Sequence, residues 1–172
     1  MDKSISILFR YLIAALLALN SLFIFYFIFS PLTIYSVYFL LSLFYPAVLT
    51  GNTIIISGLS IILVEACIAG SAYYLLTILN LTTPMPVKKR IKALFFSYLA
   101  FLIINILRIF FIALLFLSAN PYFDLTHKLF WYFLSTIFVV LIWILSVKIF
   151  KIKSIPIYTD FSYFYRKYLY KR

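Results

Sequence analysis

Long apolar runs separated by short polar or basic segments make up most of this chain, and no charged residue occurs between Arg10 and Glu65. A transmembrane helix needs about 20 consecutive apolar residues. Spans are therefore predicted at about 11–29, 65–83, 92–118 and 128–147. The third run is longer than a bilayer requires, so it must tilt or project beyond the membrane. The predicted fold class is an all-α polytopic membrane protein with about four transmembrane helices.

The region between the first two predicted spans has a different pattern. Residues 32–45 are apolar but too few to span comfortably, which predicts an interfacial or re-entrant helix on the outer side. Residues 47–63 are short Ile-, Val- and Thr-rich runs punctuated by Gly51-Asn52 and Ser57-Gly58, which predicts a small extracytoplasmic β-hairpin. If residues 32–45 span the membrane instead, Cys67 remains on the outer side only if the N-terminus also lies outside.

Basic residues set the expected orientation, because cytoplasmic loops carry an excess of Lys and Arg. Such residues occur before the first span (Lys3 and Arg10), between the second and third (88–92), and after the fourth in a basic tail (148–172). The N-terminus and the tail are therefore predicted to be cytoplasmic. Residues 1–172 are expected to form one membrane-embedded domain in the cell membrane, with its active site on the extracytoplasmic side.

Composition supports this interpretation and excludes several classes of protein. Hydrophobic residues make up 66% of the chain, whereas soluble domains are about half apolar. The net charge of +11 comes from basic residues beside apolar runs, a pattern that favours membrane orientation over nucleic-acid binding. One Cys and one His exclude an intrachain disulfide and most metal sites. We expect no metal, no cofactor and no nucleic-acid partner.

Three chemically active residues are predicted to lie at one depth near the outer surface. Counting about 20 residues from the basic end of each span puts Cys67 a few residues below the outer boundary. The same count puts Arg108 roughly one turn below that boundary and His127 at the boundary itself, at the start of the fourth span. A thiol, a guanidinium and an imidazole from three helices are thus expected to meet.

Each of these residues also has a structural interpretation. Burying Arg108 near a helix centre costs roughly 2.5–3.5 kcal/mol, so it needs an internal partner, and Asn105 shares its helical face. A lone cysteine is usually a small hydrophobe, but Cys67 opens a predicted helix, whose positive end favours a thiolate. Asp124 is a candidate for orienting the histidine from the loop, and Glu65 for lining the mouth of the site or facing the headgroups.

Three short motifs in order resemble the exosortase/archaeosortase transpeptidases. These are Cys67 between small residues in Glu65–Gly70, the Asn105-x-x-Arg108 pattern, and the later His127. The similarity extends over about 31–143 and includes the hairpin-like stretch before the cysteine. A Ser-Gly-Leu-Arg-type run often follows the cysteine in that family, whereas this chain has Ile-Ala-Gly-Ser at 68–71. Its compact length is more similar to the archaeal branch.

The resemblance implies a substrate and a reaction. Members recognise secreted proteins that end in a short motif, a transmembrane helix and a basic cluster, cleave near the motif, and pass the new carboxyl end to an acceptor, here expected to be a membrane lipid. Cys67 would be the nucleophile, His127 the proton carrier and Arg108 the stabiliser of the oxyanion or thiolate, with the last two roles partly exchangeable. The competing prediction is a small non-enzymatic transporter or assembly factor in which Arg108 binds an anion and Cys67 is not needed.

Overall fold

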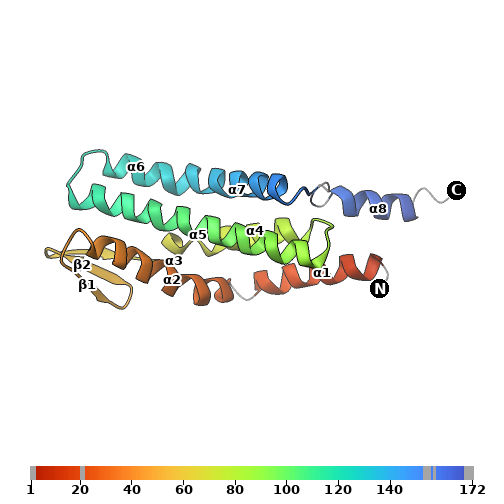
Figure 1. Cartoon of the computed structure of the whole chain (residues 1–172), viewed down its shortest axis with the longest axis horizontal. Coiled ribbons are helices and arrows are strands. Elements are labelled where there is room, and N and C mark those ends of the chain that lie inside the picture. The colour runs from red at the N-terminus through yellow and green to blue at the C-terminus, as the bar shows by residue number, and fades with distance from the viewer. Residues whose placement is uncertain (1–2, 20–21, 153–155, 157, 169–172) are drawn as a thin grey trace.

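The chain folds into an elongated bundle of helices with a small sheet at one end (Figure 1). This computed structural model describes residues 3–19, 22–152, 156 and 158–168. Part of the predicted basic tail, including Lys153, Lys171 and Arg172, lies outside the described residues. The helices are α1 (Lys3–Leu19), α2 (Phe23–Ser42), α3 (Glu65–Ile68), α4 (Gly70–Leu81), α5 (Val87–Leu117), α6 (Phe123–Leu129), the π-helical turn η1 (Phe130–Leu134), α7 (Ser135–Ile149) and α8 (Tyr158–Tyr168).

The helices run back and forth along the long axis of the molecule (Figure 1). Helices α1 and α2 follow one another toward the sheet, and α3 and α4 lead back from it. The 31-residue α5 returns to the sheet end. The consecutive segments α6, η1 and α7 lead away again toward α8. The N-terminus, the start of α5 and the end of α7 therefore share the end opposite the sheet.

The boundaries of the first predicted span, 11–29, and of the predicted helix at 32–45 differ from those in the structure. Helix α1 ends at Leu19 and α2 continues from Phe23 through Pro31 to Ser42, so the proline does not stop the helix. A proline removes one backbone hydrogen bond and kinks a helix, but neighbouring helices can hold the two halves in line. Phe29 and Thr33 are buried on either side of it. The break lies instead before α2, where Leu22 has a left-handed φ of 60°.

The predicted hairpin is present, extended by one strand. Strands β1 (Ala47–Thr50), β2 (Thr53–Ile56) and β3 (Leu59–Ile62) form an antiparallel sheet in the order β1-β2-β3. The two turns are the pairs recognised in the sequence, and Gly51 and Gly58 adopt the positive φ values, 62° and 82°, that favour glycine there. The sheet brings β3 back to α3, which carries Cys67.

The second predicted span, 65–83, is not one helix. Helix α3 ends at Ile68, Ala69 adopts a left-handed conformation with φ 59°, and α4 begins at Gly70. The third predicted segment, 92–118, lies in α5, which starts earlier and includes the basic run. The fourth, 128–147, lies within α6, η1 and α7, joined by right-handed helical residues at both junctions. The break at Ala69 and the π-helical turn η1 both lie beside the candidate site.

Aromatic side chains form the core between α2, α4 and α5. The rings of Phe29 and Tyr73 stack with centroids 3.6 Å apart, and Phe25, Tyr98 and Phe101 pack around them. Polar side chains on α4 donate to carbonyls four residues earlier in their own helix; the hydroxyl of Thr77, for example, donates to the carbonyl of Tyr73. Such bonds satisfy polar groups where no water is present.

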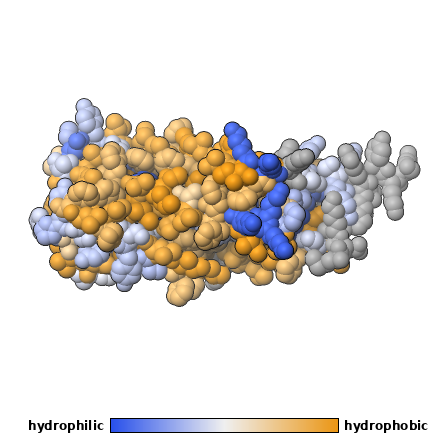
Figure 2. Space-filling model, in the orientation of Figure 1, coloured by the Kyte–Doolittle hydropathy of each residue, from blue (hydrophilic) through white to orange (hydrophobic). Residues whose placement is uncertain are grey.

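The outside of the bundle is also apolar. Large hydrophobic side chains are exposed along every long helix, and Figure 2 shows them covering the middle of the molecule. Strongly hydrophilic side chains gather in a band where α5 begins and α7 ends (Figure 2). Within the described residues, α2 and α5 are long and apolar enough to cross a membrane by length and composition. These two helices are consistent with membrane association.

A buried ion pair lies at the end of the helical bundle opposite the sheet. Arg10 on α1 donates from Nη2 to both carboxylate oxygens of Asp160 on α8, at 2.9 Å each, and from Nη1 to the carbonyl of Leu81 at 3.1 Å. Arg10 is 6% exposed and Asp160 is 2% exposed. The pair therefore joins the first helix, the end of α4 and the last helix. The sequence pattern indicates only an orientation for Arg10, and it gives no signal for Asp160.

Candidate functional site

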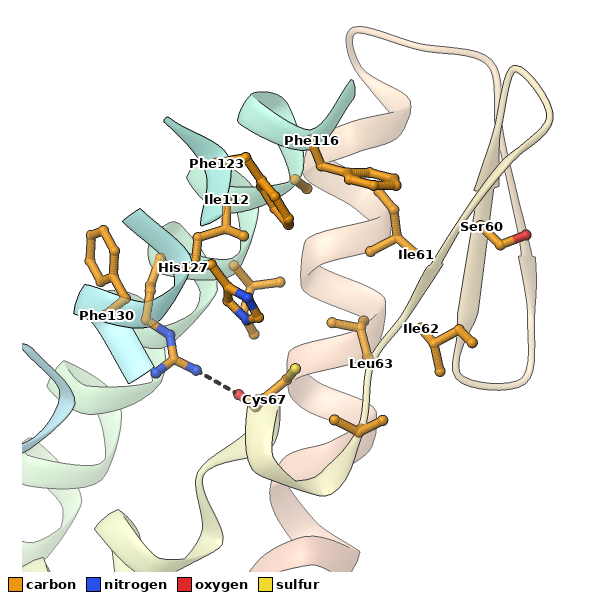
Figure 3. A pocket seen from close by; sticks show the side chains of 14 residues that line it. Ser60, Ile61, Ile62, Leu63, Cys67, Ile112, Phe116, Phe123, His127 and Phe130 are labelled. Carbon is orange, nitrogen blue, oxygen red and sulfur yellow. Dashed lines mark hydrogen bonds between the residues drawn. The ribbon is translucent and has the colours of Figure 1, made fainter. Parts of the chain in front are cut away.

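A cavity of about 260 Å³ lies at the sheet end, between the sheet, α3, α5 and α6 (Figure 3). Most of its wall is aliphatic or aromatic, and its polar side chains are few. Its lining residues are Ser60, Ile61, Ile62, Leu63, Val64, Cys67, Arg108, Ile109, Ile112, Ala113, Phe116, Phe123, His127 and Phe130. A mostly apolar pocket with a few convergent polar groups is typical of a binding or catalytic site.

The structure brings Cys67, Arg108 and His127 to this one cavity, from α3, α5 and α6. Figure 3 shows the Cys67 sulfur atom and the His127 imidazole directed toward the same space. The sequence placed all three at one depth, and the fold also places them around one volume. This grouping combines a thiol, an imidazole and a guanidinium.

Arg108 is 9% exposed, and its guanidinium joins two other helices. Its Nη2 donates to the backbone carbonyl of Cys67 at 3.2 Å, shown as the dashed line in Figure 3, and its Nη1 donates to the Ser135 hydroxyl at 2.6 Å. Its Nε has no hydrogen-bond partner among the described residues, and the guanidinium forms no ion pair with a described carboxylate. The charge is therefore held by neutral acceptors, with donor capacity left over.

Asn105 holds the same stretch of backbone as Arg108. Its Nδ2 donates to the carbonyl of Cys67 at 3.0 Å and to that of Ile68 at 3.4 Å. Carbonyls at the end of a helix lack partners within it, and α3 ends here. Residues three apart share a helical face, so the Asn-x-x-Arg pattern provides two donors to the turn that carries the cysteine.

Small residues follow the cysteine because the chain turns sharply there. Gly70 lies directly beneath the ring of Tyr26 on α2, and a Cβ atom at this position would lie 2.8 Å from two ring carbons. A side chain at residue 70 would require the Tyr26 ring, α2 or the turn to shift. The Ala-Gly pair therefore permits the close approach of α2 to the cysteine turn.

Gly70→Ala is expected to lower the free energy of unfolding by about 1–3 kcal/mol, because the added methyl group overpacks the contact with Tyr26. Chemical denaturation of the purified protein measures this change. Adding Tyr26→Ala to Gly70→Ala is expected to recover most of the loss relative to Tyr26→Ala alone. Equal costs of Gly70→Ala in both backgrounds would show that the ring is not the cause.

The π-helical turn η1 positions a residue that sequence analysis missed. The Ser135 hydroxyl accepts from Arg108 and donates to the carbonyl of Phe130, five residues earlier, at 2.8 Å. Single π turns often occur at functional sites, and this one lies opposite Arg108. The signal in the sequence was the hydroxyl pair Ser135-Thr136 inside an otherwise apolar run.

His127 lies inside α6 rather than at the start of a helix, and its ring stacks on Phe123 with centroids 5.6 Å apart. Asp124, expected in a loop, lies in the first turn of α6, is exposed and does not line the cavity. Glu65 is likewise exposed and outside the lining. The predicted stabilisation of a Cys67 thiolate by a helix dipole is also wrong, because α3 has only four residues. Arg108 is the cationic side chain that lines the cavity together with Cys67.

No protein-family model matches this chain, and no characterised protein or solved structure is significantly similar to it. A functional proposal therefore rests on the residues themselves and on their geometry.

Proposed function

We propose that this chain is a membrane-embedded cysteine peptidase and transpeptidase of the exosortase/archaeosortase kind. It would cleave C-terminal sorting signals of secreted proteins and transfer the new carboxyl end to a membrane lipid. The observation that carries this proposal is that Cys67, Arg108 and His127, from three separate elements, line one largely apolar cavity. The motifs that resemble the family contain these same three residues.

In the proposed topology the chain crosses the cell membrane four times, through α1–α2, α3–α4, α5 and α6–α7. Lys and Arg residues at the start of α5 and the end of α7 occur at the end opposite the sheet and favour a cytoplasmic location for it. The cavity at the sheet end would then face the extracytoplasmic side. A substrate's own transmembrane helix would reach this cavity laterally from the lipid.

In the first step, His127 accepts the proton of the Cys67 thiol, and the thiolate attacks the scissile carbonyl carbon of the substrate. The carbon–sulfur bond forms as the carbon–nitrogen bond breaks. The leaving amine takes the proton back from His127. The product is a thioester that joins Cys67 to the carboxyl end of the substrate, and the substrate's transmembrane tail departs.

In the second step, a lipid hydroxyl or amine attacks the thioester carbonyl. His127 accepts its proton, and the Cys67 thiolate leaves and takes that proton from His127. Water in place of the lipid would give hydrolysis. The apolar lining of the cavity favours transfer, because it limits the access of water to the thioester.

Arg108 supports both steps through its charge and its contacts. The guanidinium holds the Cys67 carbonyl and has no carboxylate partner among the described residues, so a thiolate or oxyanion can supply the missing counter-charge. In a cavity with little water such an interaction is strong.

Arg108→Lys is expected to slow processing roughly a hundredfold, because a single ammonium group cannot bridge Cys67 and Ser135 as the planar guanidinium does. The initial rate of loss of a reporter's C-terminal tail measures this effect. Arg90→Lys is the matched control, since Arg90 bonds the carbonyl of Thr83 far from the cavity. Equal processing rates for the two variants would show that Arg108 does not contribute to the reaction.

The proposal is tested by co-expressing this protein with tagged secreted proteins of the same genome that end in a short motif, an apolar helix and a basic cluster. Loss of the tail is expected, together with a covalent enzyme–reporter conjugate that hydroxylamine releases. The product mass identifies the acceptor. Retention of the tail by every such reporter would contradict the proposal.

One observation favours the second candidate, a non-enzymatic membrane protein that binds an anion. Arg108 is buried without a carboxylate partner among the described residues and also borders a second cavity. That function needs the guanidinium and not the thiol. A Cys67→Ala variant that keeps the full biological activity of the chain would select it over the peptidase.

A further inference from the structure

A second cavity, of about 350 Å³, lies on another side of Arg108. Cys67 is not among its lining residues, which come from α2, α3, the turn at Ala69, α4, α5 and α7. They are Tyr26, Ala66, Ala69, Ser71, Ala72, Leu75, Arg108, Ser135, Thr136 and Val139. Its size falls within the range of small-molecule sites. Unlike the first cavity, it carries several hydroxyl groups.

The charge of Arg108 is the first reason to expect an anion in this cavity. The side chain is 9% exposed, and no described carboxylate pairs with it. A buried cation without a counter-ion is costly. Its two other contacts, with Cys67 and Ser135, are neutral oxygens that do not cancel its charge.

The start of α4 is the second, independent reason. This 12-residue helix begins at Gly70, and Ala69, Ser71 and Ala72 around its first turn line the cavity. The N-terminus of a helix presents backbone N–H groups and a partial positive charge, both of which favour anions. The cavity therefore combines a buried guanidinium and a helix N-terminus in its wall.

The rim of the cavity suggests the chemistry of the ligand. Ser71 and Thr136 are exposed, so their hydroxyl groups are accessible to a ligand from outside the bundle. Leu75 is also exposed beside them. Hydroxyl groups and a guanidinium match the several acceptor oxygens of a phosphate, and the apolar rim suits acyl chains or the carbon atoms next to it.

We propose that this second cavity binds a phosphate group, held by Arg108, the first turn of α4 and the hydroxyls of Ser71 and Thr136. The group belongs to a phospholipid headgroup or to free phosphate. Arg108 borders both cavities, but Ser71 and Thr136 line only this one, and binding here does not require peptide cleavage. The inference therefore stands apart from the proposed peptidase activity.

Isothermal titration calorimetry on the full chain in a neutral, phosphate-free detergent tests the proposal. The probes are inorganic phosphate and a short-chain phosphatidic acid, with a short-chain diacylglycerol as the lipid without phosphate. Binding of phosphatidic acid but not of diacylglycerol is expected. Binding of inorganic phosphate as well would show that the anion alone suffices, whereas its failure to bind would assign the site to the lipid headgroup.

The location is tested with Ser71→Ala combined with Thr136→Val, which removes two rim hydroxyls and leaves Arg108 in place. Binding of phosphatidic acid is expected to weaken roughly tenfold. The matched control combines Ser42→Ala with Ser118→Ala, two exposed hydroxyls that lie outside the cavity lining. Arg108→Gln is expected to abolish binding, and Cys67→Ala to leave it unchanged.

Two results would overturn the inference. One is the absence of binding by both phosphate probes to the wild-type protein. The other is equal affinity of the rim double variant and its control, which would place the phosphate elsewhere. Because Cys67→Ala separates binding from cleavage, loss of the peptidase proposal would not remove this one.

Discussion

Replacing Cys67 with alanine is expected to abolish processing of a sorting-signal reporter, by roughly a thousandfold or more. The thiol is the proposed nucleophile, and no other cysteine exists in the chain. The substitution is expected to preserve the fold, since Asn105 and Arg108 bond the backbone carbonyl of residue 67 and not its side chain. Gel shift and mass spectrometry of the reporter's C-terminus measure the effect.

Two comparisons make this result interpretable. Cys67→Ser keeps a protonated nucleophile at the same place and is expected to retain weak processing at most, because a hydroxyl is a poorer nucleophile than a thiolate. Ser42→Ala changes an exposed hydroxyl outside both cavities and is expected to process normally. Full processing by Cys67→Ala would reject the cysteine mechanism and leave the anion-binding function.

Asp160→Asn is expected to lower the free energy of unfolding by about 3–5 kcal/mol, the largest stability effect predicted for this chain. The substitution leaves Arg10 charged and buried at 6% exposure, with only neutral oxygen acceptors as partners. Thermal or denaturant unfolding in detergent, followed by the helical circular dichroism signal, measures the change. The loss of contact between α1 and α8 is expected to expose the C-terminal helix to protease first.

Asp124→Asn is the matched control, because it removes the same charge from an exposed site on α6. It is expected to change stability by less than about 0.5 kcal/mol. Arg10→Met combined with Asp160→Leu removes both charges and is expected to recover most of the lost stability. A cost for Asp160→Asn no greater than for Asp124→Asn would show that the buried pair does not hold this end together.

Sequence analysis and structure agree where the signal is local. The turn pairs Gly51-Asn52 and Ser57-Gly58 need positive φ values that few residues adopt, so composition alone identifies them. The polar residues Asn105 and Arg108 share a helical face wherever that helix lies. Counting residues along helices also brought Cys67, Arg108 and His127 to one level, because the rise per residue is nearly constant.

They disagree where the outcome depends on neighbouring helices. Pro31 predicts the end of a helix, yet α2 continues past it, with Phe29 and Thr33 buried on either side. The break at Ala69 had no such signal, since alanine is the best helix former; the close contact of Gly70 with Tyr26 accompanies the turn there. Local propensity is a weak predictor when tertiary contacts oppose it.

The apolar helices, the small β segment, the basic residues at one end and the candidate chemical groups follow from the sequence, because each depends on residues near one another in the chain. Three features follow only from the packing of the helices. Arg108 joins Cys67 to Ser135, Arg10 pairs with Asp160, and Arg108 borders two cavities. These contacts link residues 27 to 150 positions apart. Their formation depends on how helices pack and rotate against one another, which hydropathy along a single chain does not encode.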